Sequence, residues 1–226
     1  MTPRRDPKIA AAGSLPARIA ARQRRRMFRQ FLEFARINAA HTVLDIGVSS
    51  DRTYPHSNYF ESRYPFKDRI TAVGGDDAAF LQDLYPGLRF IQADARNLPF
   101  ADRSFDFVHS SAVLEHAGSR EQQAALLREA WRVARKGIFM TTPSRWFPVE
   151  VHSVLPLVHW LPPAAFRGVL RLRGLKQLAS EDHLNLLSAS VLKRIAKHAG
   201  IENFRITSVA VAGWPSNLLL YARRTN

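Results

Sequence analysis

The stretch from Thr42 to Ser50 constrains the fold more than any other part of the chain. Its sequence, TVLDIGVSS, begins with a short apolar run that predicts a buried strand, and the glycine and small residues that follow predict a tight turn. In an open α/β sheet the carboxyl end of such a strand opens onto a ligand crevice. We therefore expect Asp45 to accept hydrogen bonds from a ligand and Gly47 to let the backbone approach it closely.

Two later runs end in the same way. Residues 70–75 predict a second strand that ends in two glycines, and Asp76 and Asp77 follow it. A carboxylate at this place can accept both hydrogens of the ribose hydroxyls of a nucleoside, although either acid can also cap the next helix. Residues 88–92 predict a third strand, which is followed by Asp94.

A fourth signal lies between the third strand and the next one. Leu98-Pro99-Phe100 and then Ser104-Phe105-Asp106 lead into a hydrophobic strand over residues 105–110. With the turn at Gly47, this order of motifs resembles the class I S-adenosylmethionine-dependent methyltransferases, in their small-molecule group (type 11). The resemblance implies an α/β Rossmann-like fold. Its sheet would be seven-stranded and mostly parallel, with an antiparallel last strand and helices on both faces.

The resemblance also implies S-adenosylmethionine as the cofactor. The turn would hold the methionine end of the cofactor, and Ser49 stands where the family usually has a second glycine. The remaining binding positions would be an acid for the ribose, an acid and a backbone amide for adenine, and a hydroxyl in the crevice. The full set of expected cofactor-binding residues is Asp45, Gly47, Ser49, Asp76, Asp77, Asp94, Ala95 and Ser110.

The fourth strand leads to Glu115 and His116, in an element similar to one that lines the cofactor and the substrate entrance in this family. Both side chains carry lone pairs suited to general-base catalysis, although both residues can equally just begin the next helix. We rank the candidate bases as His116, Glu115 and then His152. The chain contains no cysteine, and its histidines and acids lack tight ligand spacing, so the sequence predicts no metal site.

The remaining pattern predicts one methyltransferase domain over residues 17–226, preceded by a disordered basic tail at 1–16. Helices are expected at 17–37, 121–134 and 188–199, and a closing β-hairpin at 202–223. Residues 144–187 are expected to form an acceptor-binding or lid insertion, with a protein or membrane contact surface as the alternative. This insertion is apolar and basic, which suits a small acceptor that is lipid-like or anionic.

Charge leaves other functions open. The net charge is +14, and the first 36 residues hold ten arginines or lysines against two acids. A basic amino-terminal helix can recruit RNA to an RNA methyltransferase, or touch an anionic membrane peripherally. A degenerate, non-catalytic binding module is a further alternative. No transmembrane segment and no secretory signal are visible, so we expect a cytoplasmic location.

Overall fold

The computed structural model describes residues 15–52 and 57–224. The predicted tail at 1–16 lies outside these ranges, except that Leu15 and Pro16 already belong to the first helix. No helix within the described residues is both long enough and apolar enough to cross a membrane.

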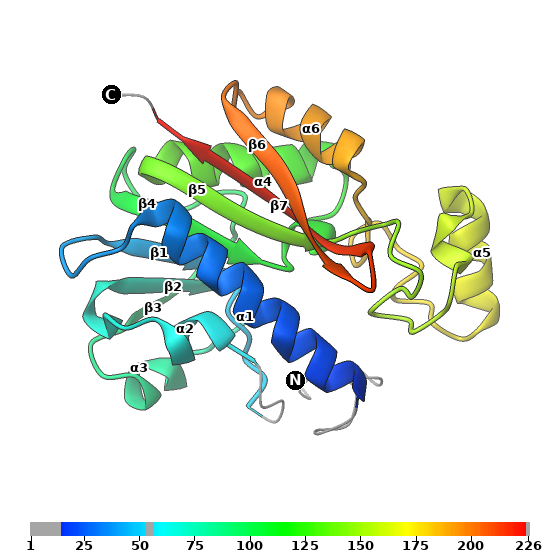
Figure 1. Ribbon diagram of the computed structural model, residues 1–226, viewed down its shortest axis with the longest axis horizontal. Coiled ribbons are helices and arrows are strands. Elements are labelled where there is room, and N and C mark those ends of the chain that lie inside the picture. The colour runs from blue at the N-terminus through cyan, green and yellow to red at the C-terminus, as the bar shows by residue number, and fades with distance from the viewer. Residues whose placement is uncertain (1–14, 53–56, 225–226) are drawn as a thin grey trace.

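Seven strands form one sheet in the order β3-β2-β1-β4-β5-β7-β6 (Figure 1). Their bounds are Val43–Ile46 (β1), Ile70–Gly74 (β2), Arg89–Gln92 (β3), Phe105–Ser111 (β4), Ala134–Pro143 (β5), Phe204–Val211 (β6) and Trp214–Arg223 (β7). The strands from β3 to β5 pair in parallel, whereas β7 is antiparallel to both β5 and β6. The predicted sheet, including its antiparallel last strand, is confirmed.

The hairpin that closes the sheet turns at Ala212 and Gly213. Both residues have positive φ, 49° and 84° respectively. Two consecutive residues with positive φ match the twist of antiparallel strands, which is why such turns connect hairpins. The turn returns β7 into the gap between β5 and β6.

Helices cover both faces of this sheet (Figure 1). Their bounds are Leu15–Ala35 (α1), Tyr59–Arg63 (α2), Phe80–Leu84 (α3), Arg120–Val133 (α4), Pro163–Leu172 (α5) and Ala189–His198 (α6), with 3-10 turns at Lys67–Arg69 (η1), Leu114–His116 (η2) and Val158–Trp160 (η3). Helix α4 begins with a capping box, in which Ser119 and Gln122 satisfy each other's backbone N–H groups.

Alternating residues of the central strands supply two cores, one on each face. Val43 and Phe107 pack with Phe31 of α1, while Leu44 and Val108 pack with α4 and α6. Because side chains alternate along a strand, strands buried on both faces appear in the sequence as continuous apolar runs. These runs are what made β1, β2 and β4 predictable.

The aromatic connection between β1 and β2 packs on the sheet instead of extending from it. Phe60 of α2 stacks on His109 of β4, with ring centroids 4.2 Å apart, and meets Phe31 edge-on at 5.3 Å. Tyr64 is fully buried beneath it. The described part of this connection therefore covers one face of the sheet; Tyr54 and Pro55 lie outside the described residues.

The segment over residues 144–187 leaves the sheet at the end of β5 and carries a small core of its own around Phe166 and Leu170 of α5. In Figure 1, α5 stands well apart from the sheet. Several hydrogen bonds anchor the base of the segment, and three of them involve Asn185 and Arg120. Asn185 N–H donates to the Glu115 carbonyl (2.7 Å), Asn185 Nδ2 to the Gly118 carbonyl (2.9 Å), and Arg120 Nη2 to the Leu186 carbonyl (2.9 Å).

Candidate active site

The turn after β1 has the backbone geometry that its glycine suggested. Gly47 has a φ of 100°, and its N–H donates to the Val73 carbonyl at 2.7 Å. A Cβ at this position would lie 2.0 Å from Cγ2 of Val113, so no side chain fits here. The next small residue, Ser49, forms two hydrogen bonds with the side-chain amide of Asn58. The Ser49 N–H donates to Asn58 Oδ1 at 2.7 Å, and the Ser49 carbonyl accepts from Asn58 Nδ2 at 2.9 Å.

Asp45 does not face the open edge of the sheet. Its carboxyl is buried, and the Nδ1 of His109 on β4 donates a short hydrogen bond to it. Burial raises the pKa of Asp45 to about 7 and lowers that of His109 to about 4, so His109 is the neutral partner. Burial, reinforced by the charge of Asp45, also raises the pKa of the neighbouring Glu61 well above its usual value. Cofactor binding by Asp45 stays a prediction.

The acids after β2 and β3 are exposed. They lie at the ends of neighbouring strands, because Gly74 of β2 pairs with Gln92 of β3. The Asp77 side chain accepts from Ala79 N–H at 2.9 Å, as a turn residue does. Asp94 is held by the Arg96 guanidinium, with Nη2 and Oδ2 2.7 Å apart. Asp76 and Asp94 therefore lie at one edge as expected, whereas the buried Asp45 carboxyl does not join them.

The two remaining cofactor candidates, Ala95 and Ser110, lie at the same edge of the sheet but are less exposed to solvent. Ala95 is half-buried and packs against the α4-side core. Ser110 is buried, and its hydroxyl donates to the Ile46 carbonyl at 2.9 Å, which ties the tip of β4 to that of β1. Ser110 thus has a structural role whether or not it meets a ligand.

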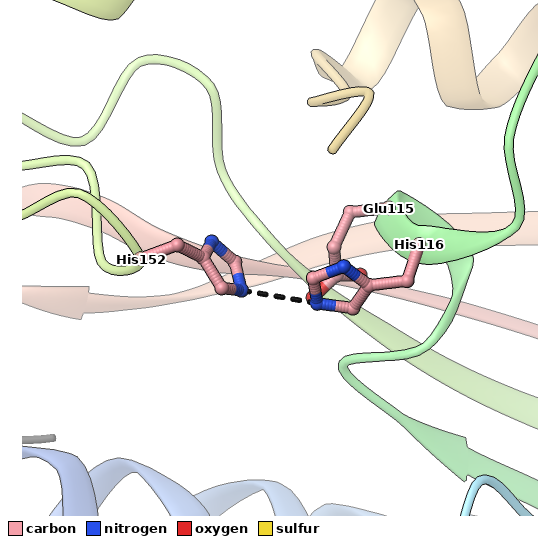
Figure 2. Close-up of side chains that lie close together, drawn as sticks. All are labelled: Glu115, His116 and His152. Atoms are coloured by element: carbon pink, nitrogen blue, oxygen red, sulfur yellow. Dashed lines mark hydrogen bonds and ion pairs between the residues drawn. The ribbon is translucent and has the colours of Figure 1, made fainter. Parts of the chain in front are cut away.

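The three candidate bases do come together (Figure 2). Glu115 and His116 lie on η2 directly after β4, while His152 comes from the insertion after β5. The two histidines face each other, with their Nε2 atoms 3.1 Å apart, and His116 Nε2 lies 3.9 Å from Glu115 Oε1. We call these three residues the Glu115–His116–His152 cluster.

Partners behind the cluster fix each side chain. His116 Nδ1 donates to the His183 carbonyl at 2.6 Å, and His152 Nδ1 donates to Glu150 Oε1 at 2.7 Å. Burial alone would raise the pKa of Glu150, but hydrogen bonds from His152 and Ser153 lower it to about 2. The other oxygen of the buried Glu115 carboxyl accepts from Thr142 Oγ1 at 2.8 Å.

A second feature lies between α1 and α2. A hollow of about 590 Å³ is lined by five arginines and two aromatic residues, namely Arg22, Arg25, Arg26, Arg29, Arg63, Phe28 and Tyr59. No acidic residue belongs to this lining. The hollow therefore offers positive charge and aromatic faces to an anionic group.

Several residues that shape the site were not foreseen. His109 and Glu61 were missed because they are distant in sequence from Asp45 and approach it only through the sheet and α2. Val113 and Glu150 were likewise missed. The sequence offers one hint for Glu150, the spacing to His152, which here forms a carboxylate–histidine pair.

Comparisons with known proteins agree with the observed fold. A family model described as a methyltransferase domain matches residues 63–141, which run from the end of α2 into β5. Over these residues the chain is similar to the methyltransferase domain family. An uncharacterized methyltransferase of Synechocystis sp. is 27% identical to it over 113 residues, which is 50% of this chain and 50% of that relative. The chain thus aligns with about half the length of this curated relative.

Solved methyltransferases share the fold. A SAM-dependent methyltransferase from Methanosarcina mazei superposes with a TM-score of 0.55 at 14% identity, covering 85% of this chain and 96% of that one. The phosphoethanolamine N-methyltransferase 2 of Haemonchus contortus, solved with S-adenosyl-L-methionine, has a TM-score of 0.54 at 15% identity, covering 82% of this chain and 38% of that one. At such identities the likeness concerns the fold.

Proposed function

We propose that this methyltransferase-fold chain binds S-adenosylmethionine and transfers its methyl group to a small, lipid-like or anionic acceptor. One observation carries the proposal: the Gly47 turn and the acids Asp76 and Asp94 occupy the carboxyl ends of three adjacent strands. In doubly wound sheets this edge is where nucleotide-like ligands bind.

Each part of the cofactor has a proposed partner at this edge. The Asp76 carboxylate is exposed and would accept from the ribose hydroxyls, and Asp94 with Ala95 would contact adenine. The backbone around Gly47 and Ser49 would hold the methionine end. Asp77, already engaged as a turn residue, is the weaker ribose candidate.

The surface of the insertion supports the proposed acceptor class. Nine large hydrophobic side chains are exposed among the described residues, and seven of them belong to residues 144–187: Trp146, Val149, Val151, Val154, Leu157, Leu161 and Leu172. Large apolar groups gathered on one exposed segment mark a contact with something apolar. Arginines at 167, 171 and 173 lie beside them and would favour a negative charge on the acceptor.

Catalysis would rest mainly on placement. Donor and acceptor held in line, with the nucleophile near the methyl carbon, react as if at very high effective concentration. The acceptor's proton would leave to His116, Glu115 or His152, because this cluster lies between β4 and the insertion.

Calorimetric titration with S-adenosylmethionine and with its demethylated product tests the cofactor assignment. We expect Asp76→Ala to weaken binding at least tenfold, about 1.4 kcal/mol, because two hydrogen bonds to a charged group are lost. Asp83→Ala, which removes an exposed acid of α3, is the matched control. If the unmodified protein binds neither compound at millimolar concentration, the chain is a non-catalytic module.

The arginine-lined hollow favours a second candidate function, RNA methylation. Here α1 and α2 would hold the RNA phosphates through the five arginines, while Phe28 and Tyr59 would offer faces for stacking. An RNA product that carries labelled methyl groups, formed only when α1 keeps its arginines, would favour this candidate over the small acceptor.

A further inference from the structure

The Glu115–His116–His152 cluster brings three hydrogen-bond acceptor atoms together: the two histidine Nε2 atoms and Glu115 Oε1. A backbone carbonyl and an ionised carboxylate only accept hydrogen bonds, so His116 and His152 carry their protons on Nδ1, toward His183 O and Glu150. In the neutral rings both Nε2 atoms are then acceptors, yet they face each other at 3.1 Å. Two lone pairs at this distance repel each other unless a proton or a metal ion lies between them.

Glu115 adds a third donor atom to the same point. Its side chain is completely buried, and no hydrogen-bond donor reaches Oε1 within the part of the chain that the structure describes. Burying a carboxylate oxygen without a hydrogen-bond donor is unfavourable, and a bound cation beside Glu115 Oε1 would offset this cost. Figure 2 shows the Glu115 carboxyl beside the His116 ring, and Oε1 lies 3.9 Å from His116 Nε2.

We propose that Glu115 Oε1 and the Nε2 atoms of His116 and His152 bind one divalent transition-metal ion, for which Zn²⁺ is the best fit. The three atoms all lie within 4.8 Å of one another. Bond lengths of about 2.0–2.2 Å place tetrahedral ligands about 3.4 Å apart, so a small rotation of Glu115 closes the site. Two imidazoles and one carboxylate suit Zn²⁺ better than Mg²⁺ or Ca²⁺, which prefer oxygen ligands.

The surroundings have the second layer that metal sites use. Metal-binding histidines usually donate their other ring N–H to a carboxylate or a carbonyl, which fixes the ring and raises its basicity. His152 does so to Glu150 and His116 to His183 O, while Thr142 orients Glu115. His116 is 38% exposed in its side chain, which leaves an entry path from solvent.

The site also suits the proposed function, on which this last step depends. Three protein ligands leave a coordination position open, as catalytic zinc sites do. With their lone pairs on the metal, the three residues would act as ligands and no longer as bases. An acceptor hydroxyl bound to the metal would have a lower pKa and lose its proton to solvent. Its oxygen would then form a bond to the methyl carbon, and the carbon–sulfur bond would break with its electron pair going to sulfur.

Metal binding is tested on tag-free protein by Zn²⁺ competition against a chromophoric chelator, without any methyl acceptor. Because the chain has no cysteine, thiolates cannot contribute to the signal. We expect one Zn²⁺ per chain, and a more than 100-fold loss of affinity in His116→Asn and in His152→Asn, since even second-layer changes cost about 10–100-fold. His198→Asn, on exposed α6, should bind like the unmodified protein.

Co²⁺ provides a second readout that does not depend on affinity. Bound Co²⁺ of low coordination number should give visible absorption in the unmodified protein, and this absorption should vanish in His152→Asn, whose fold is checked by circular dichroism. The proposal is overturned if no Zn²⁺ binds, or if the His116 and His152 variants bind it as His198→Asn does. Cofactor titration of the same samples separates this outcome from a failure of the methyltransferase assignment.

Discussion

Asp106 connects three strands through one carboxylate. It accepts from the Thr42 N–H that precedes β1 (3.0 Å) and pairs with Arg135 and Lys136 of β5 (2.9 and 3.1 Å). Burial alone would raise the pKa of Asp106, but these hydrogen bonds outweigh it and lower the pKa to about 2. The sequence showed this residue only as the start of a strand.

We predict that Asp106→Asn destabilises the protein by about 2 kcal/mol at pH 7. A folded-state pKa below the unfolded value stabilises the protein above about pH 4, and this contribution is lost as the pH falls from about 4 to 2. Urea unfolding at pH 7 and near pH 3 should therefore show a smaller difference at the lower pH. The control is Asp102→Asn, which changes an exposed carboxylate. If Asp106→Asn lowers the free energy of unfolding equally at both pH values, the charge of Asp106 does not have this role.

Gly47 is constrained both by its backbone and by its neighbour. We predict that Gly47→Ala costs about 2–4 kcal/mol, because it combines a strained φ with a clash against Val113. Adding Val113→Ala should recover the steric part and leave the backbone part. Gly75→Ala, where nothing lies within 4 Å of the new Cβ, should be nearly neutral. Guanidinium unfolding of these three variants and of the unmodified protein gives the two contributions. Equal losses of stability with and without Val113→Ala would exclude the clash.

At the scale of elements, strands were far easier to predict than short helices. Each central strand is an apolar run, and the expected strand at residues 42–46 is observed at Val43–Ile46. Helices α2 and α3 have five residues each, too few to form alone, and exist because Phe60 and Leu81 are buried against the sheet. These two segments are too short to show a helical periodicity, so the sequence did not predict them.

The insertion is held to the sheet mainly through Arg120 of α4 and Asn185. Arg120 Nη2 donates to the Leu186 carbonyl and Nη1 to Gln123 Oε1 at 2.7 Å. We predict that Arg120→Met loosens residues 144–187 by about 2 kcal/mol, since hydrogen bonds from a charged donor are lost. Limited proteolysis should then cut within this segment several-fold faster.

Arg128→Met, on the same helix but with one long contact of 3.4 Å to the His198 carbonyl, is the matched control for Arg120. Equal cleavage rates in the two variants would show that the segment is held by its own core. The cluster around Phe166 would then carry the stability alone.

At the scale of the whole molecule, the charge is the property that the sequence states most directly. A net charge of +14 attracts polyanions at long range, but only the structure places five arginines around one hollow. The candidate bases were likewise named from sequence, whereas their meeting across β4 and the insertion depends on tertiary contacts.

We predict that a labelled single-stranded RNA binds with an affinity that falls steeply with salt. Replacing Arg22, Arg25 and Arg29 together by Gln should weaken binding at least tenfold at low salt and flatten the salt dependence. The control replaces three exposed basic residues elsewhere, Arg171, Arg173 and Lys176. Fluorescence anisotropy measures both, and an equal loss in the two triples would mean that net charge alone, and not the hollow, attracts RNA.

The position of β7 has a consequence for how this protein is made. Residues 214–223 come last along the described chain, yet they fill the interior gap between β5 and β6. While the ribosome is still holding these residues, two rows of backbone hydrogen-bonding groups stay open to solvent and to other nascent chains. We therefore expect chaperone dependence to be greatest while residues 214–223 are still inside the ribosome and to fall once this strand has paired with β5 and β6.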